Sequence, residues 1–374
     1  MNRTRIAILM PNLDGGGAER VAVHLANGLD KRGHIVEMVL MQAKGVFLAD
    51  LAPSIRVVDL NTPRVRAAIY PLVRYMRDAR PQALLANMWP ITLNALLAKS
   101  IARVPTRIVV AEHCTWSRSE LMEWSTVSWQ VRTSMRLFYP RADGIVAVSR
   151  GAADDLASFA RLNRKAIKVI YNPVIDPNLG AAPTNEHVPS AWWHGTHKRL
   201  LAVGALKQIK DYETLLDAFA QLRTRIDARL LILGEGQERA SLEAQVQRLG
   251  LQGQVLLPGF VKNLEVYYQH ANLFLLSSNS EGFGNVIVEA LAAGTPVVST
   301  DCPSGPREIL ADGRFGQLVP VGNAAALAEA MEQSLMSDHD HEALKVRAQD
   351  FSIDRAVDQY EALLFPTDTR KLTA

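Results

Sequence analysis

The chain has 374 residues, of which 48% are hydrophobic and 21% charged, a balance that excludes intrinsic disorder and favours two globular domains over one. Two cysteines are too few for a disulfide framework or a cysteine-rich zinc site, and they fit a reducing cytosol. No run of about 18 uncharged apolar residues occurs. Met1–Met10 lacks the apolar core of a signal peptide, so we expect a cytoplasmic protein without a membrane-spanning helix.

The net charge of +3 combines a basic first half with an acidic second half. Residues 1–178 carry 24 Lys and Arg against 14 Asp and Glu, whereas residues 179–374 carry 17 against 24. A basic half indicates an anionic partner, such as a membrane surface, a phosphorylated acceptor or nucleic acid. Solvated arginines that only keep the domain soluble explain the same bias equally well.

Strands and helices alternate through the first 178 residues. Arg5–Met10 is a continuous apolar run that predicts a buried parallel strand, Ala18–Asp30 has helical spacing, and Ile35–Leu40 predicts the next strand. This unit of about 35 residues has the size of a βαβ crossover. Further strands are predicted at Ala83–Ala86, Arg107–Ala111 and Gly144–Val148, and further helices at Leu93–Arg103 and Val127–Tyr139.

A segment rich in proline and glycine, Asn172–His197, predicts a linker, after which the alternation restarts. We therefore expect two doubly wound, Rossmann-like α/β domains, at residues 1–178 and 195–350, and a helical tail at 351–374. The predicted strands of the second domain are Arg199–Val203, Arg229–Leu233, Val255–Leu257, Leu273–Ser277 and Pro296–Ser299, and the helices are Tyr212–Arg223, Glu238–Leu249, Asn285–Ala293 and, in the tail, Ser352–Leu364. Ligands of such sheets bind in the loops that follow the strands.

Gly15, Gly16 and Gly17 lie between the first strand and the first helix. Glycines let backbone N–H groups approach a ligand, and a helix N-terminus favours phosphate or carboxylate. A flexible turn explains the same glycines. The dinucleotide fingerprint G-x-G-x-x-G is incomplete because Arg20 stands at its third glycine, which argues against a dinucleotide oxidoreductase.

A second motif, Glu281 to Glu289 (EGFGNVIVE), follows a strand and opens a helix. The backbone from Gly282 to Asn285 can present amides to phosphate or sugar oxygens. The Glu289 carboxylate can accept hydrogen bonds from vicinal hydroxyls, as acids do for ribose, and Glu281 can do so for a second sugar ring. A carboxylate that stabilises a helix dipole explains one glutamate but not both.

Two lysines and a histidine complete the candidate residues. Lys207 and Lys210 follow the strand Arg199–Val203 and are suited to neutralise a diphosphate. A cation at a helix start is mildly unfavourable, so local helix electrostatics do not explain Lys210. His113 ends a strand of the first half, where a structural role is the alternative to a functional one.

Together these motifs resemble retaining glycosyltransferase family 4, which has the GT-B fold. The resemblance covers nearly the whole chain, and its most specific part is the Glu-x7-Glu element within EGFGNVIVEALAAGTPVV, residues 281–298. The other matching segments are GGGAERV at 15–21, EHC at 112–114, AVS at 147–149, YNP at 171–173, GALKQIKDY at 204–212, LGEG at 233–236, PGF at 258–260 and STDCPSGPREIL at 299–310.

The resemblance implies that the two domains face a central cleft and that the tail crosses back to the first domain. It implies catalytic roles for three residues: Glu281 on the transferred sugar, Lys210 on the diphosphate and His113 beside the donor sugar. The donor-binding residues that it implies are Gly15, Gly16, Gly17, Lys207, Phe260, Gly282, Phe283, Gly284, Asn285, Val286 and Glu289, with Glu289 on the ribose and Phe260 near the base.

The chain departs from the family pattern at two positions. Ala205 stands where family members commonly carry the arginine of an Arg…Lys phosphate clamp. Lys207 is the candidate replacement, although the single ammonium of lysine does not reproduce the two parallel hydrogen bonds of an arginine guanidinium. Cys114 stands where related chains often have Asn. These departures concern donor affinity more than reaction type.

The implied reaction moves a hexose or N-acetylhexosamine from a nucleoside-diphosphate sugar to a hydroxyl of a glycan or lipid-linked glycan, with retention. A UDP-sugar is the first choice of donor and GDP-mannose the second. We expect no cofactor and no obligate metal, because lysines, loop amides and a helix dipole supply positive charge and no Asp-x-Asp lies between a strand and a loop. We also expect no covalent enzyme nucleophile.

Basic and aromatic residues occur together in residues 67–80 and 116–139. This combination suits an anionic membrane surface, at the cytosolic face, and then a lipid-linked acceptor. Core-packing helices with a solvated face explain it equally well. Nucleic acid is not expected, because it leaves the Glu-x7-Glu element unexplained. The residues concerned are Tyr70, Arg74, Arg77, Arg80, Trp116, Arg118, Trp124, Trp129, Arg132 and Arg136.

Two other functions stay open at this stage. A non-hydrolysing nucleotide-sugar epimerase needs acid and base residues that flank the sugar, and His113 is the one plausible candidate in the sequence. A protein that binds nucleotide sugars without catalysis is the other possibility, because Ala205 replaces the arginine of the phosphate clamp.

Overall fold

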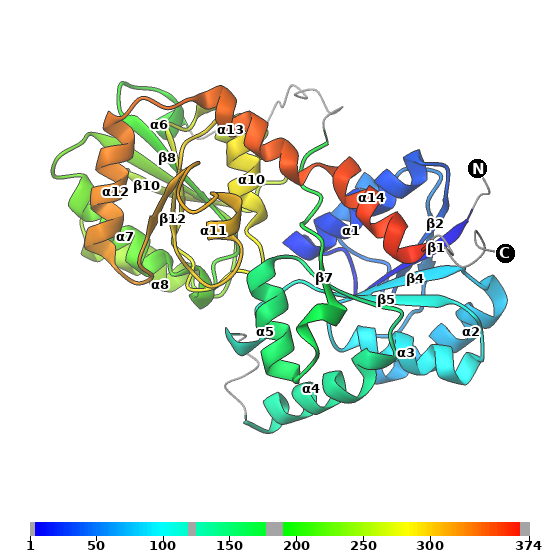
Figure 1. The fold of residues 1–374 in the computed structure, drawn as a ribbon. Helices are drawn as coiled ribbons and strands as arrows, with labels where there is room; N and C mark the ends of the chain where they lie inside the picture. The colour runs from blue at the N-terminus through cyan, green and yellow to red at the C-terminus, as the bar shows by residue number, and fades with distance from the viewer. Residues whose placement is uncertain (1–3, 119–124, 177–189, 367–374) are drawn as a thin grey trace. The chain divides into compact units, whose positions relative to one another are not determined.

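The computed structural model describes residues 4–118, 125–176 and 190–366. Its contacts divide the chain into two compact units, each built on one parallel sheet (Figure 1). The N-terminal unit comprises Met1–Val174 together with Ser352–Ala374, and the C-terminal unit comprises Ile175–Phe351. The predicted first boundary, at residue 178, and the last part of the predicted tail, residues 367–374, lie outside the described residues.

The sheet of the N-terminal unit has seven strands in the order β3-β2-β1-β4-β5-β6-β7, all parallel. Its central strands are almost wholly buried because helices cover both faces, which is why they consist of continuous apolar runs. The strands are β1 Arg5–Met10, β2 Ile35–Leu40, β3 Arg56–Asp59, β4 Ala83–Asn87, β5 Arg107–Glu112, β6 Gly144–Ala147 and β7 Ile167–Val169.

One face of this sheet is covered by α1 and α14, and the other by the layer α2 to α5 (Figure 1). Helix α14 packs on α1 at Gly28, where a Cβ would come within 2.7 Å of Val357 and 2.8 Å of Ile353. The tail helix is therefore part of the hydrophobic core of the N-terminal unit. The helices are α1 Gly17–Lys31, α2 Ile69–Ala79, α3 Ile91–Ala102, α4 Ser125–Phe138, α5 Arg150–Ala160 and α14 Ile353–Leu364, with 3-10 turns η1 Val46–Asp50, η2 Val65–Ala68, η3 Trp116–Arg118, η5 Tyr139–Arg141 and η6 Arg164–Ala166.

The C-terminal unit has six parallel strands in the order β10-β9-β8-β11-β12-β13, around a second hydrophobic core. Its strands are β8 Lys198–Val203, β9 Ala228–Leu233, β10 Val255–Gly259, β11 Leu273–Leu276, β12 Val297–Thr300 and β13 Gln317–Val319. Its helices are α6 Ser190–Trp193, α7 Tyr212–Leu222, α8 Arg239–Arg248, α9 Glu265–His270, α10 Asn285–Ala292, α11 Pro306–Ile309, α12 Ala324–Met336 and α13 His341–Ala348, with 3-10 turns η7 Gln208–Lys210 and η8 Gln349–Phe351.

The prediction that Asn172–His197 is entirely a linker is wrong at both ends. Asn172 is buried, and the Trp192 side chain in α6 is fully buried. The indole Nε1 of Trp192 donates to the carbonyl of Leu200 in β8 over 3.2 Å. The composition indicated a linker because prolines and glycines lie on both sides of Trp192. Burial of this one large aromatic side chain nevertheless fixes residues 190–193 to the C-terminal unit.

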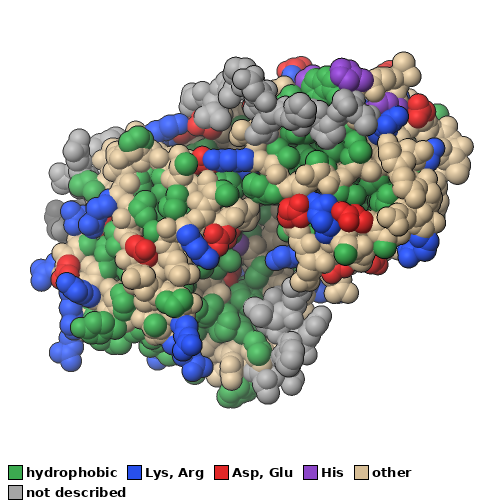
Figure 2. Space-filling model, turned by 180° about the vertical axis from the view of Figure 1, so that it is seen from behind, with side chains coloured by type: hydrophobic (Ala, Val, Ile, Leu, Met, Phe, Trp, Pro, Cys, Tyr) green, Lys and Arg blue, Asp and Glu red, His purple; other side chains and the backbone are tan. Residues whose placement is uncertain are grey.

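The α2–α4 layer carries an exposed basic and aromatic surface. Figure 2 shows basic and hydrophobic side chains close together on the N-terminal unit. Tyr70 is 78% exposed, Trp129 66% and Leu137 55%. We use the name basic face for the exposed basic and apolar side chains of η2, α2 and α4, which are Arg66, Tyr70, Arg74, Arg77, Trp129, Arg132, Arg136 and Leu137. Among them, Arg74 lies 3.6 Å from the exposed carboxylate of Asp78. Trp124 lies outside the described residues, and Trp116 is buried rather than on this face. Among the helices of the described ranges, none combines the length and apolar character needed to cross a bilayer.

Candidate active site

The clearest charge pair of the C-terminal unit joins Lys210, at the end of η7, to Glu281, in the loop after β11. Lys210 Nζ lies 2.6 Å from Glu281 Oε1, and the two side chains are 21% and 11% exposed. Ser278 Oγ donates to the same oxygen over 2.6 Å. Ser277 Oγ donates to the carbonyl of Lys210 over 2.7 Å, which ties η7 to the end of β11. A cation and a carboxylate are therefore fixed side by side at the carboxyl ends of β8 and β11.

Glu289 lies in the second turn of α10, which begins at Asn285 after Gly284 with φ of 102°. Its Oε2 accepts a hydrogen bond from the hydroxyl of Tyr268 in α9 over 2.8 Å. Tyr268 is buried, and its own carbonyl accepts from Thr295 Oγ1 over 2.6 Å. Tyr268 was not among the predicted site residues, because it contacts Glu289 from a separate helix.

Loops that follow neighbouring strands pack backbone against backbone in this unit. A Cβ at Gly305 would lie 1.7 Å from the carbonyl oxygen of Phe283, so the loop after β12 rests directly on the Glu281–Gly284 segment. A Cβ at Gly234 would lie 2.0 Å from the carbonyl oxygen of Gly204, which brings the loop after β9 against the loop after β8. These glycines explain why the family-like segments contain small residues: a side chain would separate the loops.

Lys207 and Phe260 are exposed, and neither joins the Lys210–Glu281 pair in the contacts described. Lys207 lines a neighbouring cavity of about 180 Å³, together with Asp211 and Asn279. Ala205 is also exposed, in the same loop. The backbone of Gly282 and Phe283 belongs to the loop that carries Glu281, while Asn285 and Val286 form the first turn of α10.

The predicted glycines of the N-terminal unit stand at the start of α1. Gly15 has φ of 121°, Gly16 is the N-cap, and Gly17 is the first helical residue. Gly16 and Gly17 are exposed, so backbone N–H groups at this helix N-terminus lie at the surface. A Cβ on Gly16 would come within 2.3 Å of the Glu19 carboxylate.

His113 follows β5, and its Nε2 lies 3.0 Å from Oδ1 of Asn87 at the end of β4. Burial lowers the pKa of His113 to about 4, so the ring is neutral at pH 7. Its Nδ1 is buried and has no hydrogen-bond partner among the residues that the structure describes. A neutral imidazole of this kind is a hydrogen-bonding group, not a cation for a phosphate.

Beside His113, Glu112 is fully buried at the end of β5. It accepts hydrogen bonds from the hydroxyl of Tyr139 and from the backbone N–H of Trp89, the latter over 3.5 Å. Burial raises the pKa of Glu112 to about 7. Asn87 and Glu112 were not among the predicted site residues; the signal that could have found them is a polar residue at the end of a buried strand.

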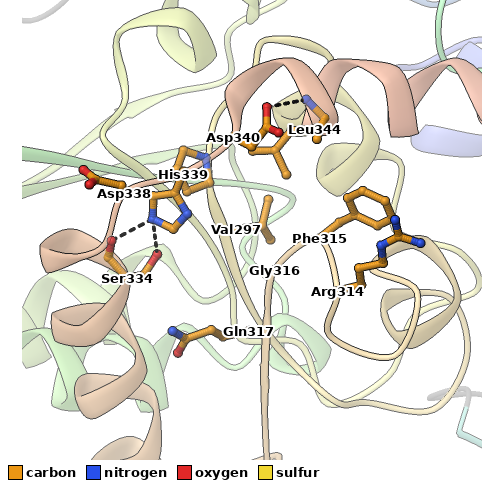
Figure 3. Close-up of a pocket in the computed structure, with 12 residues that line it drawn as sticks. Val297, Arg314, Phe315, Gly316, Gln317, Ser334, Asp338, His339, Asp340 and Leu344 are labelled. Carbon is orange, nitrogen blue, oxygen red and sulfur yellow. Dashed lines mark hydrogen bonds between the residues drawn. The ribbon is translucent and has the colours of Figure 1, made fainter.

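A second cavity of the C-terminal unit, about 410 Å³, lies elsewhere (Figure 3). It is lined by Val297 and Gln317, the first residues of β12 and β13, and so opens at the amino ends of the strands. His339 lies at this cavity with its Nε2 bonded to the Ser334 carbonyl over 2.8 Å. None of the predicted site residues lines it. The described residues also contain no group of three or more His, Cys, Asp or Glu side chains arranged to hold a metal ion.

Two family models match the chain, one on each half. Residues 15–176 match Glycosyltransferase Family 4, and residues 186–351 match Glycosyl transferases group 1. One relative, from Campylobacter jejuni, is N-acetylgalactosamine-N,N'-diacetylbacillosaminyl-diphospho-undecaprenol 4-alpha-N-acetylgalactosaminyltransferase, 30% identical over 92% of this chain and 93% of its own length. Another is the lipopolysaccharide core biosynthesis glycosyltransferase LpsE of Rhizobium meliloti, 27% identical over 93% and 96%.

Solved structures share the fold of the chain. Anabaena HepE in complex with UDP-glucose superposes with a TM-score of 0.79 at 23% identity, covering 97% of this chain and 99% of that one. The apo form of the lipopolysaccharide outer core galactosyltransferase WaaB gives a TM-score of 0.72 at 20% identity, covering 97% and 99%. With two parallel Rossmann-like sheets, matches to both family models and a relative 30% identical over nearly its whole length, the chain belongs to the family 4 glycosyltransferases of the GT-B fold.

Proposed function

We propose that this glycosyltransferase moves a hexose or N-acetylhexosamine from a UDP-sugar to a hydroxyl of a lipid-linked glycan, with retention at the anomeric carbon and without an obligate metal. The observation that carries the proposal is the contact between Lys210 and Glu281 at the carboxyl ends of β8 and β11. The two charges suit the two parts of a nucleotide sugar, because an ammonium binds phosphate and a carboxylate accepts from sugar hydroxyls.

In this proposal the diphosphate competes with Glu281 for Lys210. As the bond from the anomeric carbon to the phosphate oxygen breaks, negative charge grows on the diphosphate. Lys210 and the N-terminus of α10, at Asn285, stabilise that charge from fixed positions. Glu281 then accepts hydrogen bonds from the sugar, and Glu289, held by Tyr268, accepts from the ribose.

The acceptor oxygen forms its bond to the anomeric carbon on the face that the phosphate leaves. Its proton passes to the departing phosphate oxygen, so the products are the nucleoside diphosphate and the new glycoside. No enzyme carboxylate forms a covalent bond in this scheme. A trapped glycosyl-enzyme adduct would contradict this step.

Two similarities support the donor and the acceptor. Anabaena HepE has been solved with UDP-glucose and with UDP. The Campylobacter jejuni relative is named for an acceptor on diphospho-undecaprenol and for an alpha linkage. For this chain we infer from them a uridine nucleotide and a lipid-linked acceptor.

We further propose that the protein works at the cytosolic side of an anionic membrane and that the basic face rests on the lipid. Five arginines lie on this face beside three exposed apolar or aromatic side chains, and α4 carries no acidic residue. Arginine attracts anionic headgroups, and tryptophan and tyrosine favour the interface between headgroups and acyl chains. An enzyme bound to the membrane would encounter a lipid-linked acceptor by diffusion along the membrane surface rather than through the solution.

The test is product analysis of the purified protein with a panel of nucleotide sugars, each with and without a lipid-linked glycan acceptor. The proposal predicts an alpha-linked product and free UDP only when a UDP-sugar and the acceptor are both present, with no change on adding EDTA. A new nucleotide sugar formed without acceptor would indicate an epimerase. Donor binding without any transfer would indicate a non-catalytic binding protein.

A further inference from the structure

The cavity of about 410 Å³ in the C-terminal unit is separate from the Lys210–Glu281 pair (Figure 3). Its volume falls in the range of about 300–1,000 Å³ that is typical of small-molecule sites. The cavity opens at the amino ends of β12 and β13, which begin with Val297 and Gln317. Lys210 and Glu281 lie at the carboxyl edge of the same sheet, and a six-residue strand such as β8 spans about 20 Å between the two edges. A ligand in this cavity is therefore not the donor bound at that pair.

The lining of the cavity combines buried apolar residues with polar side chains that reach solvent. Val297 and Leu344 are buried, whereas Arg314 is exposed and Gln317 and His339 are half-buried. Figure 3 shows His339 and Gln317 on one side of Val297 and Arg314 on the other. Apolar walls with a few polar groups that fix the orientation of the ligand are characteristic of small-molecule sites.

His339 provides a hydrogen-bond acceptor at this cavity. Its Nε2 lies 2.8 Å from the carbonyl oxygen of Ser334, which can only accept, so Nε2 carries the proton and donates. In the neutral ring Nδ1 is then an acceptor. This Nδ1 makes no hydrogen bond in the described part of the chain and, unlike Nδ1 of His113, it is not enclosed by protein. It is therefore open to a ligand.

Arg314 and Gln317 provide hydrogen-bond donors. The guanidinium carbon of Arg314 lies 5.1 Å from the centre of the Phe315 ring, and no carboxylate within the described ranges forms an ion pair with it. The side-chain amide of Gln317 has no hydrogen-bond partner among the residues that the structure describes. Both side chains thus retain their hydrogen-bonding capacity for a ligand.

The charges of the lining and its mixture of donors and acceptors favour a neutral saccharide. Two carboxylates, those of Asp338 and Asp340, line the cavity against one guanidinium, that of Arg314, and this balance disfavours a polyanion such as a nucleotide. A sugar hydroxyl both donates and accepts, so it can pair with a carboxylate, an imidazole acceptor, an amide or a guanidinium. A purely apolar ligand would instead leave these groups desolvated and without partners.

We propose that this cavity is an exosite for a neutral saccharide, in which a hexose or N-acetylhexosamine unit binds away from the reacting atoms. His339 and Asp338 accept hydrogen bonds from its hydroxyls, and Gln317 and Arg314 donate to its oxygens. The bound unit belongs either to the glycan acceptor, at a distance from its reacting end, or to a free sugar. The first source rests on the proposed function, because it requires a glycan acceptor.

Methyl NMR of protein with 13C-labelled Leu and Val side chains detects binding directly, since Val297 and Leu344 line the cavity. The probes are the methyl glycosides of glucose, galactose, N-acetylglucosamine and N-acetylgalactosamine, with UDP present throughout to occupy the donor site. At least one glycoside should shift both methyl signals in a saturable way. Single substitutions at the two positions identify their signals. If no glycoside shifts these signals, the proposal is wrong.

Two substitutions test whether the signals report occupancy of the cavity. Gln317→Leu removes the amide at nearly constant volume, and Ala343→Phe places a larger side chain in the cavity that Ala343 lines. Each should weaken glycoside binding about tenfold or more, because a lost hydrogen bond or a blocked site removes affinity. Gln247→Leu and Ala244→Phe, at exposed positions of α8 in the same unit, are the matched controls and should bind like wild type. Wild-type affinity in a folded cavity variant would overturn the proposal, so one of the two suffices if the other does not fold.

Kinetics then identify the source of the saccharide. For a glycan acceptor, Ala343→Phe should raise the KM of an oligosaccharide acceptor several-fold at unchanged kcat, and it should leave transfer to a monosaccharide acceptor unchanged. For a free sugar, an added glycoside that is not itself an acceptor should change the rate with the short acceptor in wild type but not in Ala343→Phe. Glycoside binding with neither effect would overturn the assignment as an exosite. The NMR titration needs no turnover, so a protein that transfers no sugar refutes the proposed function while occupancy of the cavity is still decided.

Discussion

Lys210 Nζ and Glu281 Oε1 lie 2.6 Å apart although 71 residues separate them in the chain. One side chain comes from the turn after β8 and the other from the loop after β11, and these two strands are neighbours in the sheet. The parallel sheet thus brings two complementary chemical functions, a cation and a carboxylate, to one point at its carboxyl edge. The pair makes separate predictions for catalysis and for stability.

Lys210→Met should lower kcat roughly 100-fold or more, because it removes a fixed charge from the developing diphosphate. It should also destabilise the C-terminal unit by about 1–3 kcal/mol, because Glu281 is left with little exposure and without its cation. Adding Glu281→Gln should restore part of this stability but none of the activity. Urea unfolding of the two single variants and the double variant measures the coupling. Strictly additive losses would show that the ion pair does not stabilise the fold.

Tyr268→Phe should weaken donor binding without slowing the chemical step. The change removes the hydroxyl that donates to Glu289 over 2.8 Å and leaves the buried ring in place. Because the ribose is remote from the reacting carbon, we expect the donor KM to rise about 3- to 10-fold with little change in kcat. Tyr267→Phe, on the same helix with its ring against Trp192, is the control. A fall in kcat at unchanged KM would place Glu289 at the reacting sugar instead.

Glu112 makes the stability of the N-terminal unit depend on pH. Burial raises its pKa from 4.5 to about 7, so between these values the folded protein holds a proton that the unfolded chain has released. This contribution to stability is fully present below pH 4.5 and is lost as the pH rises through 7. Glu112→Gln removes this titration. The unfolding free energy of the variant minus that of wild type should therefore be about 2–3 kcal/mol larger at pH 8 than at pH 5. His113 titrates in both proteins and cancels in this difference, and a difference independent of pH would contradict the prediction.

Reducing the charge of the basic face should release the protein from anionic vesicles. Arg66→Gln together with Arg74→Gln should lower partitioning to vesicles of phosphatidylglycerol more than tenfold, because each arginine near such a surface contributes about 1 kcal/mol. Sedimentation of vesicles at low and high salt measures it, and neutral phosphatidylcholine vesicles should bind little protein. Arg248→Gln, an exposed arginine of the C-terminal unit, should leave binding unchanged. Equal binding of all three proteins would exclude the basic face as the membrane contact.

The central strands of both sheets could be predicted because each is buried on both faces and so appears as an unbroken apolar run, as in Arg5–Met10. Three strands were missed: β3, β7 and β13. Each has only three or four residues and lies at the edge of its sheet, where most of the side chains are exposed or half-buried and the apolar run is interrupted.

The residues that hydrogen-bond to the site residues and orient them were harder to predict than the site residues themselves. Lys210 and Glu281 belong to recognisable motifs, but nothing in the sequence relates Tyr268 to Glu289 or Asn87 to His113. Those pairs depend on which strands and helices become neighbours, and a buried Asn or Tyr in an apolar segment has many other uses. The alternation of strands and helices predicted which edge carries the loops, but not which side chains bond there.

The most direct test of the proposed donor site is to measure how nucleotides change the stability of the protein. Thermal and chemical unfolding are followed with UDP, GDP, ADP and dTDP, each with and without EDTA, for wild type and for Glu289→Ala. A nucleotide at about 100 times its dissociation constant adds roughly 2.7 kcal/mol to the unfolding free energy. A metal-independent site for a uridine nucleotide predicts this gain with UDP, unchanged by EDTA and lost in Glu289→Ala. A gain that EDTA abolishes, a preference for another nucleotide, or no gain with any of the four would contradict it.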